Sequence, residues 1–382
     1  MTRVRLGDVC TIVSGSTPKT EVPEYWDGDK DWITPAELSD DTYIVEESVR
    51  KITDVGISKT GLKPFPAGTV ILSSRAPIGK VAIAGKEMYC NQGFKNLICS
   101  DKINNEYLYW FLKGNTRYLN SLGRGATFKE ISKTIVENIE INLPSKPEQL
   151  HASTVLKRCW DIIALRKKQL HVLDELIKAR FVELFGDMIL NPNGWEQSSL
   201  GKVCDVRDGT HDSPKYYMEG YPLVTSKNVT SGKIDFSDCS LICEDDYEKI
   251  NQRSKVDYGD ILMPMIGTVG NPVIVDVEPK FAIKNVALIK FYEDSSVLNT
   301  FVKGLLESDY FDRAVISKVR GGTQKFIALG NIRELQISIP PMNIQLDYQY
   351  FVQQVDKSKS VVKKSLDETQ LLFDSLMQKY FG

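Results

Sequence analysis

Two carboxylates and a lysine in the second half of the chain have a spacing that a metal-dependent nuclease could use. Asp260 lies eighteen residues before Glu278-x-Lys280, and paired carboxylates can hold the divalent cation of such an enzyme. The first half has no carboxylate-x-lysine at the equivalent place. Asp260 follows a glycine in a predicted turn, and Pro279 would disrupt the strand that such sites need. We therefore expect no catalytic residue here, with a stand-alone metal-dependent DNA endonuclease as the alternative.

Motifs for nucleotide cofactors are missing from the sequence. No G-x-x-x-x-G-K-[ST] segment is present, and no Asn/Asp-Pro-Pro-Tyr/Phe segment of the kind that amino-methyltransferases use to hold a target nitrogen. Gly123-Arg124-Gly125 follows a predicted helix rather than a strand, and it lacks the third glycine of a dinucleotide-binding loop. The sequence therefore predicts no cofactor on this chain.

The cysteines and histidines do not form a metal-binding pattern. Of seven cysteines, only Cys239 and Cys243 are close together, and no second pair completes a zinc site. The three histidines, at positions 151, 171 and 211, are dispersed. We expect no metal site, and we expect reduced thiols in a cytoplasmic protein.

Polar and basic side chains that could read nucleic acid gather at predicted turns. Arg and Lys can pair with guanine edges, Asn with adenine edges, and Thr with phosphates. The candidates are Thr17, Lys19, Arg75, Lys80, Arg124, Thr127 and Lys129 in the first half, and His211, Lys215, Lys227, Asn228, Lys284, Arg320, Thr323 and Lys325 in the second. For any one of them the competing interpretation is a solvated surface charge, and both Thr127 and Thr323 could belong to a helix cap.

The charge balance of the whole chain argues against a polybasic DNA binder. Its 382 residues contain 48 Lys and Arg against 50 Asp and Glu, a net charge of −2, whereas polybasic binders carry a large positive field. The length predicts two or three domains. No long apolar run follows Met1, and nowhere do eighteen apolar residues stand together. We therefore expect no signal peptide and no membrane span.

An internal repeat organises these residues into two similar halves. The repeated segments occur in the same order and are separated by 191 to 196 positions. They are residues 6–10 and 200–204, 68–72 and 259–263, 125–127 and 321–323, 141–144 and 337–340, and 185–186 and 381–382. The chain is therefore interpreted as a diverged tandem duplication.

Each half begins with a strand-rich segment of mixed α+β character. Short apolar runs at 70–72 and 81–83, and at 261–263 and 273–275, flank segments that contain Pro and Gly. Helical stretches are expected near 105–122 and 297–318. We predict strand-rich domains at 1–145 and 187–341.

A long helix is predicted to complete each half, at 146–186 and 342–382. Ser145-Lys146-Pro147-Glu148 is a capping box with Pro in the first turn, and Gly186 follows Phe185 as a stop signal. Apolar residues recur in a heptad pattern, which favours pairing between the two helices. The alternative is that each helix lies on its own domain. The predicted helix–helix seam comprises Leu156, Ile163, Leu170, Ile177, Leu184, Val352, Val355, Val362, Leu366, Phe373, Leu376 and Tyr380.

The whole chain resembles a specificity (S) subunit of a type I restriction–modification system. In the first half the resemblance rests on residues 15–18, 24–26 and 32–35, and in the second on residues 208–211, 213–216 and 222–228. These segments are similar to the two common openings of target recognition domains in that family. The Ile-x-Leu-Pro and Ile-x-Ile-Pro junctions and the Phe-Gly helix ends also fit, over essentially the full length.

The resemblance implies a non-catalytic subunit that recognises double-stranded DNA. Two target recognition domains would each read one half of an asymmetric bipartite sequence, and the two long helices would pack as an antiparallel coiled coil with pseudo-two-fold symmetry. The helices would dock two methyltransferase (M) subunits, and two restriction (R) subunits could join them. AdoMet and ATP with Mg²⁺ would bind those partners. The alternatives from other classes are the endonuclease above and a tandem-domain scaffold for protein interactions.

Overall fold

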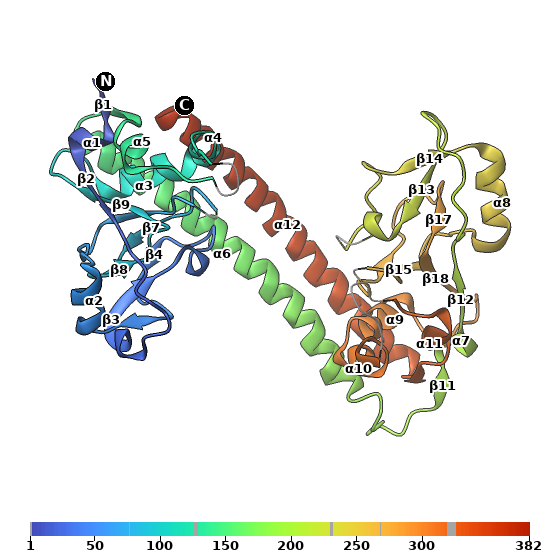
Figure 1. Ribbon diagram of the computed structural model, residues 1–382. Helices are drawn as coiled ribbons and strands as arrows, with labels where there is room; N and C mark the ends of the chain where they lie inside the picture. Colours follow the sequence, from blue (N-terminus) through green and yellow to red (C-terminus); the bar gives the residue numbers. More distant parts are fainter. Residues whose placement is uncertain (1, 76, 126–128, 230–231, 268, 319–325) are drawn as a thin grey trace. The chain divides into compact units, whose positions relative to one another are not determined.

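Two structural units divide the chain, and each contains a strand-rich head and one part of each long helix. The computed structural model describes residues 2–75, 77–125, 129–229, 232–267, 269–318 and 326–382. Unit 1 comprises Met1–Arg166 and Ser365–Gly382, and unit 2 comprises Lys167–Lys364 (Figure 1). We call residues 2–143 head 1 and residues 197–338 head 2.

Head 1 is built on a mostly antiparallel sheet in the order β2-β9-β6-β7-β4 and a smaller sheet in the order β5-β3-β8. A third pair, β1 with β10, closes the head beside the start of the long helix. The strands are β1 Thr2–Arg5, β2 Cys10–Ser14, β3 Trp26–Ile33, β4 Ile44–Val45, β5 Lys51–Ile52, β6 Val70–Leu72, β7 Val81–Ala84, β8 Tyr89–Cys90, β9 Lys95–Cys99 and β10 Glu140–Leu143.

Head 2 repeats this plan with a sheet in the order β12-β18-β15-β16, a smaller sheet β14-β13-β17 and the closing pair β11-β19. The strands are β11 Gln197–Ser199, β12 Cys204–Asp208, β13 Tyr221–Thr225, β14 Ser240–Ile242, β15 Ile261–Pro264, β16 Val273–Ile274, β17 Ala282–Lys284, β18 Val286–Phe291 and β19 Gln336–Ser338. The predicted duplication and α+β class are thus confirmed, because the strands of the two heads pair in the same order.

Short helices cover the sheets. They are α1 Leu6–Val9, α2 Asp54–Thr60, α3 Asn105–Gly114, α4 Thr116–Ser121 and α5 Lys133–Glu137 in head 1, and α7 Leu200–Val203, α8 Glu244–Ser254, α9 Asn299–Leu306, α10 Asp309–Ala314 and α11 Leu329–Arg333 in head 2. Each predicted helical stretch is broken into two α-helices, and a 3₁₀ helix at Ile316–Lys318 follows the second pair. Asn115 leaves helical geometry between α3 and α4, and the extended Ser308 precedes α10.

The long helices are α6 Lys146–Phe185 and α12 Met342–Phe381. The Glu148 half of the predicted capping box is present at the start of α6, where a carboxylate oxygen of Glu148 accepts from the backbone N–H and the hydroxyl of Ser145, at 2.9 and 2.7 Å. Gly186 ends the helix with φ +66°, a left-handed geometry that glycine adopts without strain. None of the helices in the described part of the chain is long and apolar enough to cross a membrane.

In unit 1 the first part of α6 packs antiparallel against the last part of α12. The rings of Trp160 and Phe373 lie 5.9 Å apart, and six residues further along α6 Arg166 donates to the hydroxyl of Thr369. Both helices also join the core of head 1, where Phe381 packs 5.0 Å from Tyr107 of α3.

In unit 2 the last part of α6 packs antiparallel against the first part of α12. Asp174 of α6 pairs with Lys359 of α12, and Phe181 lies 5.6 Å from Tyr348. The end of α6 enters the core of head 2, where Phe185 lies 4.9 Å from Phe301 of α9. The helices therefore pair, as predicted, and they also pack on the heads, so pairing and packing on the heads occur together.

The residues of the predicted seam are shielded from solvent. Leu156, Ile163, Val355 and Phe373 are buried. The others are half-buried, namely Leu170, Ile177, Leu184, Val352, Val362, Leu366, Leu376 and Tyr380.

Candidate nucleic-acid interface

The loop after β2 in head 1 presents Thr17 and Lys19 to solvent. Gly15 allows the loop to approach the end of β8, because a Cβ there would lie 2.0 Å from the carbonyl oxygen of Cys90. The hydroxyl of Thr17 donates to Oε1 of Gln92, which belongs to the loop between β8 and β9. The side chain of Lys19 is exposed, while its carbonyl accepts from the indole of Trp26 at 3.1 Å. The loop is therefore held by its backbone and by the Thr17–Gln92 contact, and it leaves the Lys19 side chain exposed.

Several cations gather around Glu130 at the same sheet of head 1. Its carboxylate lies 3.1 Å from Nζ of Lys95 and 3.9 Å from the Arg75 guanidinium. The backbone of Glu130 exchanges two hydrogen bonds with Arg124, whose side chain is exposed, as is that of Lys129. One carboxylate thus faces several cations, which leaves a local positive charge that could meet phosphates.

Lys80 has a structural role in the fold of head 1. Its ammonium group donates to the carbonyl oxygens of Pro35 and Leu38, so it holds the segment after β3 in place. Thr127 lies outside the described residues.

In head 2 the loop after β12 carries His211, whose side chain is 60% exposed. Its Nε2 lies 2.8 Å from Oδ2 of Asp208, and its Nδ1 lies 2.9 Å from Oδ1 of Asn285. Asp208 is buried and also accepts from the guanidinium of Arg253. The hydrogen bonds to Asn285 and Asp208 raise the pKa of His211 above its ordinary value of 6.5, although burial and Arg253 act in the opposite direction.

The three candidate lysines of head 2 that the structure describes have partners close by. Nζ of Lys284 lies 2.5 Å from the hydroxyl of Ser213. Lys215 lies over the ring of Tyr217, at 5.6 Å, and Lys227 forms a 2.9 Å ion pair with Asp238. Contacts of this kind at the surface are weak, so those of Lys215 and Lys284 could be exchanged for contacts with phosphates.

Asn228 is buried and fully engaged within its own turn. Its Oδ1 accepts from the N–H and the hydroxyl of Thr225, and its Nδ2 donates to the carbonyl of Asp235. A base contact by this amide would require breaking the turn. Arg320, Thr323 and Lys325 lie outside the described residues.

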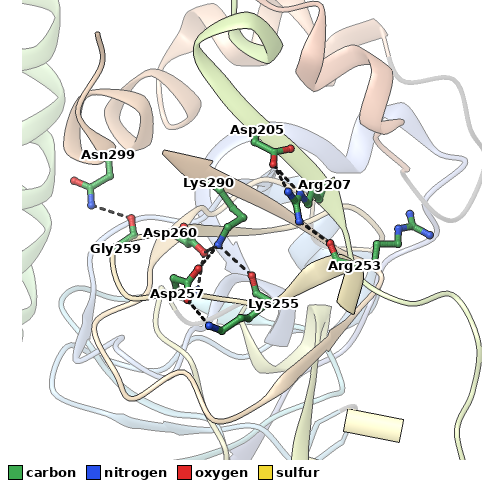
Figure 2. Close-up of polar contacts among 9 residues, drawn as sticks. All are labelled: Asp205, Arg207, Arg253, Lys255, Asp257, Gly259, Asp260, Lys290 and Asn299. Atoms are coloured by element: carbon green, nitrogen blue, oxygen red, sulfur yellow. Dashed lines mark hydrogen bonds and ion pairs between the residues drawn. The ribbon is translucent and has the colours of Figure 1, made fainter. Parts of the chain in front are cut away.

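Asp260, the carboxylate of the nuclease alternative, is buried and supports the turn that precedes β15 (Figure 2). One oxygen accepts from Nζ of Lys290 and from the backbone N–H of Asp257, both at 2.7 Å. Burial raises the pKa of Asp260, and the contact with Lys290 offsets part of that rise. Glu278 and Lys280 are exposed and pair with each other at 2.7 Å. Among the described residues, no three His, Cys, Asp or Glu side chains are grouped to hold a metal ion.

Sequence reasoning missed Gln92, Lys95, Arg253 and Asn285. Lys95 begins an apolar strand and is itself buried, so its position in the sequence indicated a core segment rather than a cation beside Glu130. Gln92 and Asn285 lie in loops more than 70 residues from the side chains that they contact. One signal could have indicated Gln92 and Asn285, namely their equivalent places in the two heads. Gln92 precedes β9, which pairs with β2, and Asn285 precedes β18, which pairs with β12.

Comparison with known proteins gives one consistent result. A family model described as type I restriction modification DNA specificity domain matches residues 1–175 and again 192–369. The chain is 31% identical to the type I restriction enzyme MjaIX specificity subunit of Methanocaldococcus jannaschii, over 98% of this chain and 91% of that protein. It is 20% identical to the EcoBI specificity subunit of Escherichia coli, over 74% of this chain and 66% of that protein.

Solved structures share the fold over the full chain. The S subunit of a type I restriction–modification system from M. genitalium superposes with a TM-score of 0.61 at 16% identity, covering 100% of this chain and 96% of that one. A chain from a structural study of complex assembly in the type I R-M system superposes with a TM-score of 0.60 at 19% identity, covering 100% and 97%.

Proposed function

Since the chain belongs to the type I restriction modification DNA specificity family, we propose that it selects the DNA sequence for a type I restriction–modification complex. Each head reads one half of a bipartite target in double-stranded DNA. The observation that carries the proposal is that one fold occurs twice with different polar side chains on equivalent loops. Around the loops after β2 and β12, head 1 has Thr17 and Gln92 where head 2 has His211 and Asn285. Two different reading surfaces favour two different half-sites, and hence an asymmetric target.

The long helices are proposed to dock two M subunits, one on each unit. Large apolar side chains that do not enter the seam support this assignment, because apolar side chains exposed in groups mark protein interaction sites. Those of unit 1 are Leu150, Ile162, Leu165, Leu371 and Leu372, and those of unit 2 are Val172, Leu176, Val182, Leu346, Tyr350 and Val361.

The chemistry of the complex is assigned to the partner subunits. M subunits would bind AdoMet and methylate adenine, and two R subunits, where present, would bind ATP with Mg²⁺ and cleave DNA. The contacts of Asp260 favour this division, because its carboxylate is engaged by Lys290. A net charge of −2 suits weak DNA binding by the chain alone and specific binding in the assembled complex. Seven unpaired cysteines are compatible with the cytoplasm, where we place the complex.

The decisive experiment coexpresses the chain with an M subunit encoded beside it and maps the methylated adenines. We expect one asymmetric bipartite sequence. Replacement of residues 1–145 by the same segment of another specificity subunit should change one half-site and leave the other intact. Replacement of residues 187–341 should do the converse, with the segments 146–186 and 342–382 retained in both chimaeras.

Other outcomes would contradict the proposal in different ways. Alteration of both half-sites by one chimaera would contradict independent reading by the heads. DNA cleavage by the isolated chain with Mg²⁺, lost on Asp260→Ala, would identify an endonuclease. Copurification without any sequence-selective DNA binding would identify a protein-interaction scaffold.

A further inference from the structure

The imidazole of His211 lies between two oxygen atoms. Nδ1 faces Oδ1 of Asn285 at 2.9 Å and Nε2 faces Oδ2 of Asp208 at 2.8 Å. A neutral imidazole has one N–H donor and one acceptor nitrogen, so it can donate to only one of these oxygens. Satisfying both oxygens requires an N–H on each nitrogen, which is the charged imidazolium.

The charges around the ring favour this protonation state. Asp208 faces the ring from the end of β12, where it is buried and in contact with the guanidinium of Arg253 from α8. From β17, Lys284 is engaged by Ser213 on the same loop as His211, and Asp212 of that loop is exposed. Arg207 is directed to Asp205 and to the carbonyl of Arg253 (Figure 2). The nearest charge is therefore the Asp208 carboxylate, which stabilises a positive ring.

The backbone fixes the two loops that carry this pair. Gly209 allows the loop after β12 to contact β17, because a Cβ there would lie 2.2 Å from the carbonyl oxygen of Ile283. Asn285 has φ +55°, a left-handed geometry that Asn tolerates better than most residues. Its N–H donates to the carbonyl of Thr210 at 3.2 Å, and its own carbonyl accepts from Ser226. Only the amide of Asn285 and the ring of His211 are left to respond to their surroundings.

The protonation state of the ring decides which group Asn285 presents outward. With an N–H on Nδ1, the ring holds Oδ1, and the Nδ2 amide group of Asn285 is left as a donor. With the proton removed from Nδ1, the ring accepts a hydrogen bond from Nδ2, and Oδ1 is left as an acceptor. Rotation of the amide by 180° exchanges the two states without moving the backbone.

Head 1 has an equivalent contact between a loop side chain and an amide, in which neither partner is titratable. The hydroxyl of Thr17 donates to Oε1 of Gln92. Thr17 and His211 are 194 positions apart, Gln92 and Asn285 are 193 apart, and the repeat has offsets of 191 to 196. In each head a residue after the first sheet strand therefore holds the carbonyl oxygen of an amide on the facing loop.

We propose that Asn285 is a specificity-determining residue of head 2, which donates Nδ2–H to an acceptor on the edge of a base, and that protonated His211 is the positioning residue that orients it. The inference rests on the proposed function and adds a prediction about it. Recognition by head 2 depends on pH, and recognition by head 1, through Gln92, does not. An amide donor suits N7 or O6 of a purine or O4 of thymine.

The test uses the complex of the full chain with its M subunits and has two measurements. The first is an NMR titration of the histidine ring signals, in which the signal of His211 is assigned by its loss in His211→Ala. We expect a pKa above 6.5 for His211 and a shift toward higher pH in Asn285→Asp, because a second carboxylate then faces the ring. Titration of His211 at or below 6.5 overturns the inference while leaving the proposed function intact.

The second measurement is DNA affinity between pH 5.5 and 8.5 on targets with single substitutions in one half-site. We expect discrimination at one base pair of head 2's half-site to fall about tenfold as pH rises through the pKa of His211, and to be lost at every pH in Asn285→Asp. Discrimination in head 1's half-site should stay constant. Asn331→Asp makes the same charge change on the exposed surface of α11 and should alter neither.

Three results would overturn the inference. Equal pH dependence in both half-sites would remove the role of His211. Equal weakening of all DNA sequences in Asn285→Asp would assign the amide to a phosphate rather than to a base edge. Absence of sequence-selective binding by the wild-type complex at any pH would overturn the proposed function together with this inference.

Discussion

Gln149 and Gln345 lie 196 residues apart and make the same contacts in units 1 and 2. Each is buried near the start of a long helix. Oε1 accepts from the backbone N–H of the N-cap residue of a head helix, and Nε2 donates to the carbonyl of the proline that precedes the long helix. The distances are 2.7 and 2.9 Å to Asn104 and Pro144 for Gln149, and 2.8 and 2.8 Å to Leu298 and Pro340 for Gln345. One side chain thus joins each long helix to the head beside its start.

Replacement of either glutamine by leucine should destabilise the unit that contains it. Leucine has similar volume but leaves the N–H and carbonyl partners unpaired, so we expect a loss of about 2–4 kcal/mol in the free energy of unfolding. Hydrogen exchange on the full chain would localise the loss to α3 and its sheet in Gln149→Leu, and to α9 and its sheet in Gln345→Leu. Gln370→Leu, at an exposed position of α12, is the matched control. Equal loss of protection in both heads would contradict separate anchoring.

The architecture could be predicted from sequence because its signals are periodic or repeated. The offset between the halves, the capping box at Ser145 and the heptads of α6 and α12 are each visible within the linear chain. The packing of both helices on each head was not visible. It depends on aromatic residues such as Phe181, in the core of head 2, and Phe381, against the core of head 1. The heptad pattern does not include these residues, so it could not predict which head each of them contacts.

The contacts within the candidate interface could not be predicted from sequence in the same way, because they join loops that are distant in the chain. A lysine or an asparagine in a turn looks the same whether it is free or engaged. Lys80 and Asn228 were selected as possible DNA contacts, and the fold uses both to hold backbone. Asn285 was not selected, although it contacts His211, because 74 residues separate them.

Asp31 makes head 1 sensitive to acid. It is buried on β3, where burial would raise its pKa, but Lys86, Ser48 and Lys51 hold it at about 2, below the ordinary value of 3.8. Because the folded-state pKa is the lower one, the stabilisation is present above pH 4 and is lost as pH falls toward 2. Asp31→Asn should lower the free energy of unfolding by about 2 kcal/mol at pH 7 and flatten the acid limb of the stability curve.

Urea denaturation between pH 2 and 7 measures this effect. Asp29→Asn is the matched control, because the Asp29 side chain is 77% exposed, and we expect it to leave the transition midpoint nearly unchanged. An acid limb in Asp31→Asn as steep as that of the wild type would show that other carboxylates cause the acid sensitivity.

Asp260→Ala should affect stability and not catalysis. The substitution leaves the Lys290 ammonium, 18% exposed, without one of its two carboxylates, and it removes an acceptor from the N–H of Asp257. We expect a loss of about 2–3 kcal/mol, with methylation by the assembled complex at permissive temperature unchanged. Glu278→Gln, at an exposed position, should change neither quantity. This account would be contradicted if the isolated wild-type chain cleaved DNA with Mg²⁺ and Asp260→Ala lost that activity without a change in its thermal denaturation midpoint.

Cys10 and Cys99 should form a disulfide when the chain is treated with a thiol oxidant such as diamide. They lie directly opposite on the antiparallel strands β2 and β9. The hydrogen bond from the N–H of Ser100 to the carbonyl of Val9 makes them a non-hydrogen-bonded pair, with Cα atoms about 4.5 Å apart, which a disulfide can span. Their mutual hydrogen bond lowers the pKa of Cys99 and raises that of Cys10, so Cys99 is the expected nucleophile.

Peptide mapping of the oxidised chain would identify this cross-link. Cys204 is the internal control, because it occupies the position of Cys10 in head 2 and faces Phe291 rather than a cysteine. A cross-link that involves Cys204 under native conditions, or none between Cys10 and Cys99, would contradict the register of β2 with β9.

Lys359 and Asp174 should contribute to the pairing of α6 with α12 in unit 2. Lys359 occupies a heptad position that is otherwise apolar, and its Nζ lies 2.5 Å from Oδ1 of Asp174. A single polar residue at such a position specifies register more than it adds stability. Because Asp174 is half exposed, a double-mutant cycle with Lys359→Met and Asp174→Asn should give a coupling energy of only about 0.5–1 kcal/mol.

Exchange of the two charges tests the contact between the helices directly. Asp174→Lys places like charges together and should destabilise the pairing of α6 with α12, and Lys359→Asp in the same chain should restore it. Lys178 and Glu175, an exposed pair within α6, provide the matched charge exchange. If that exchange cost as much as Asp174→Lys, contact between the helices would not be the cause.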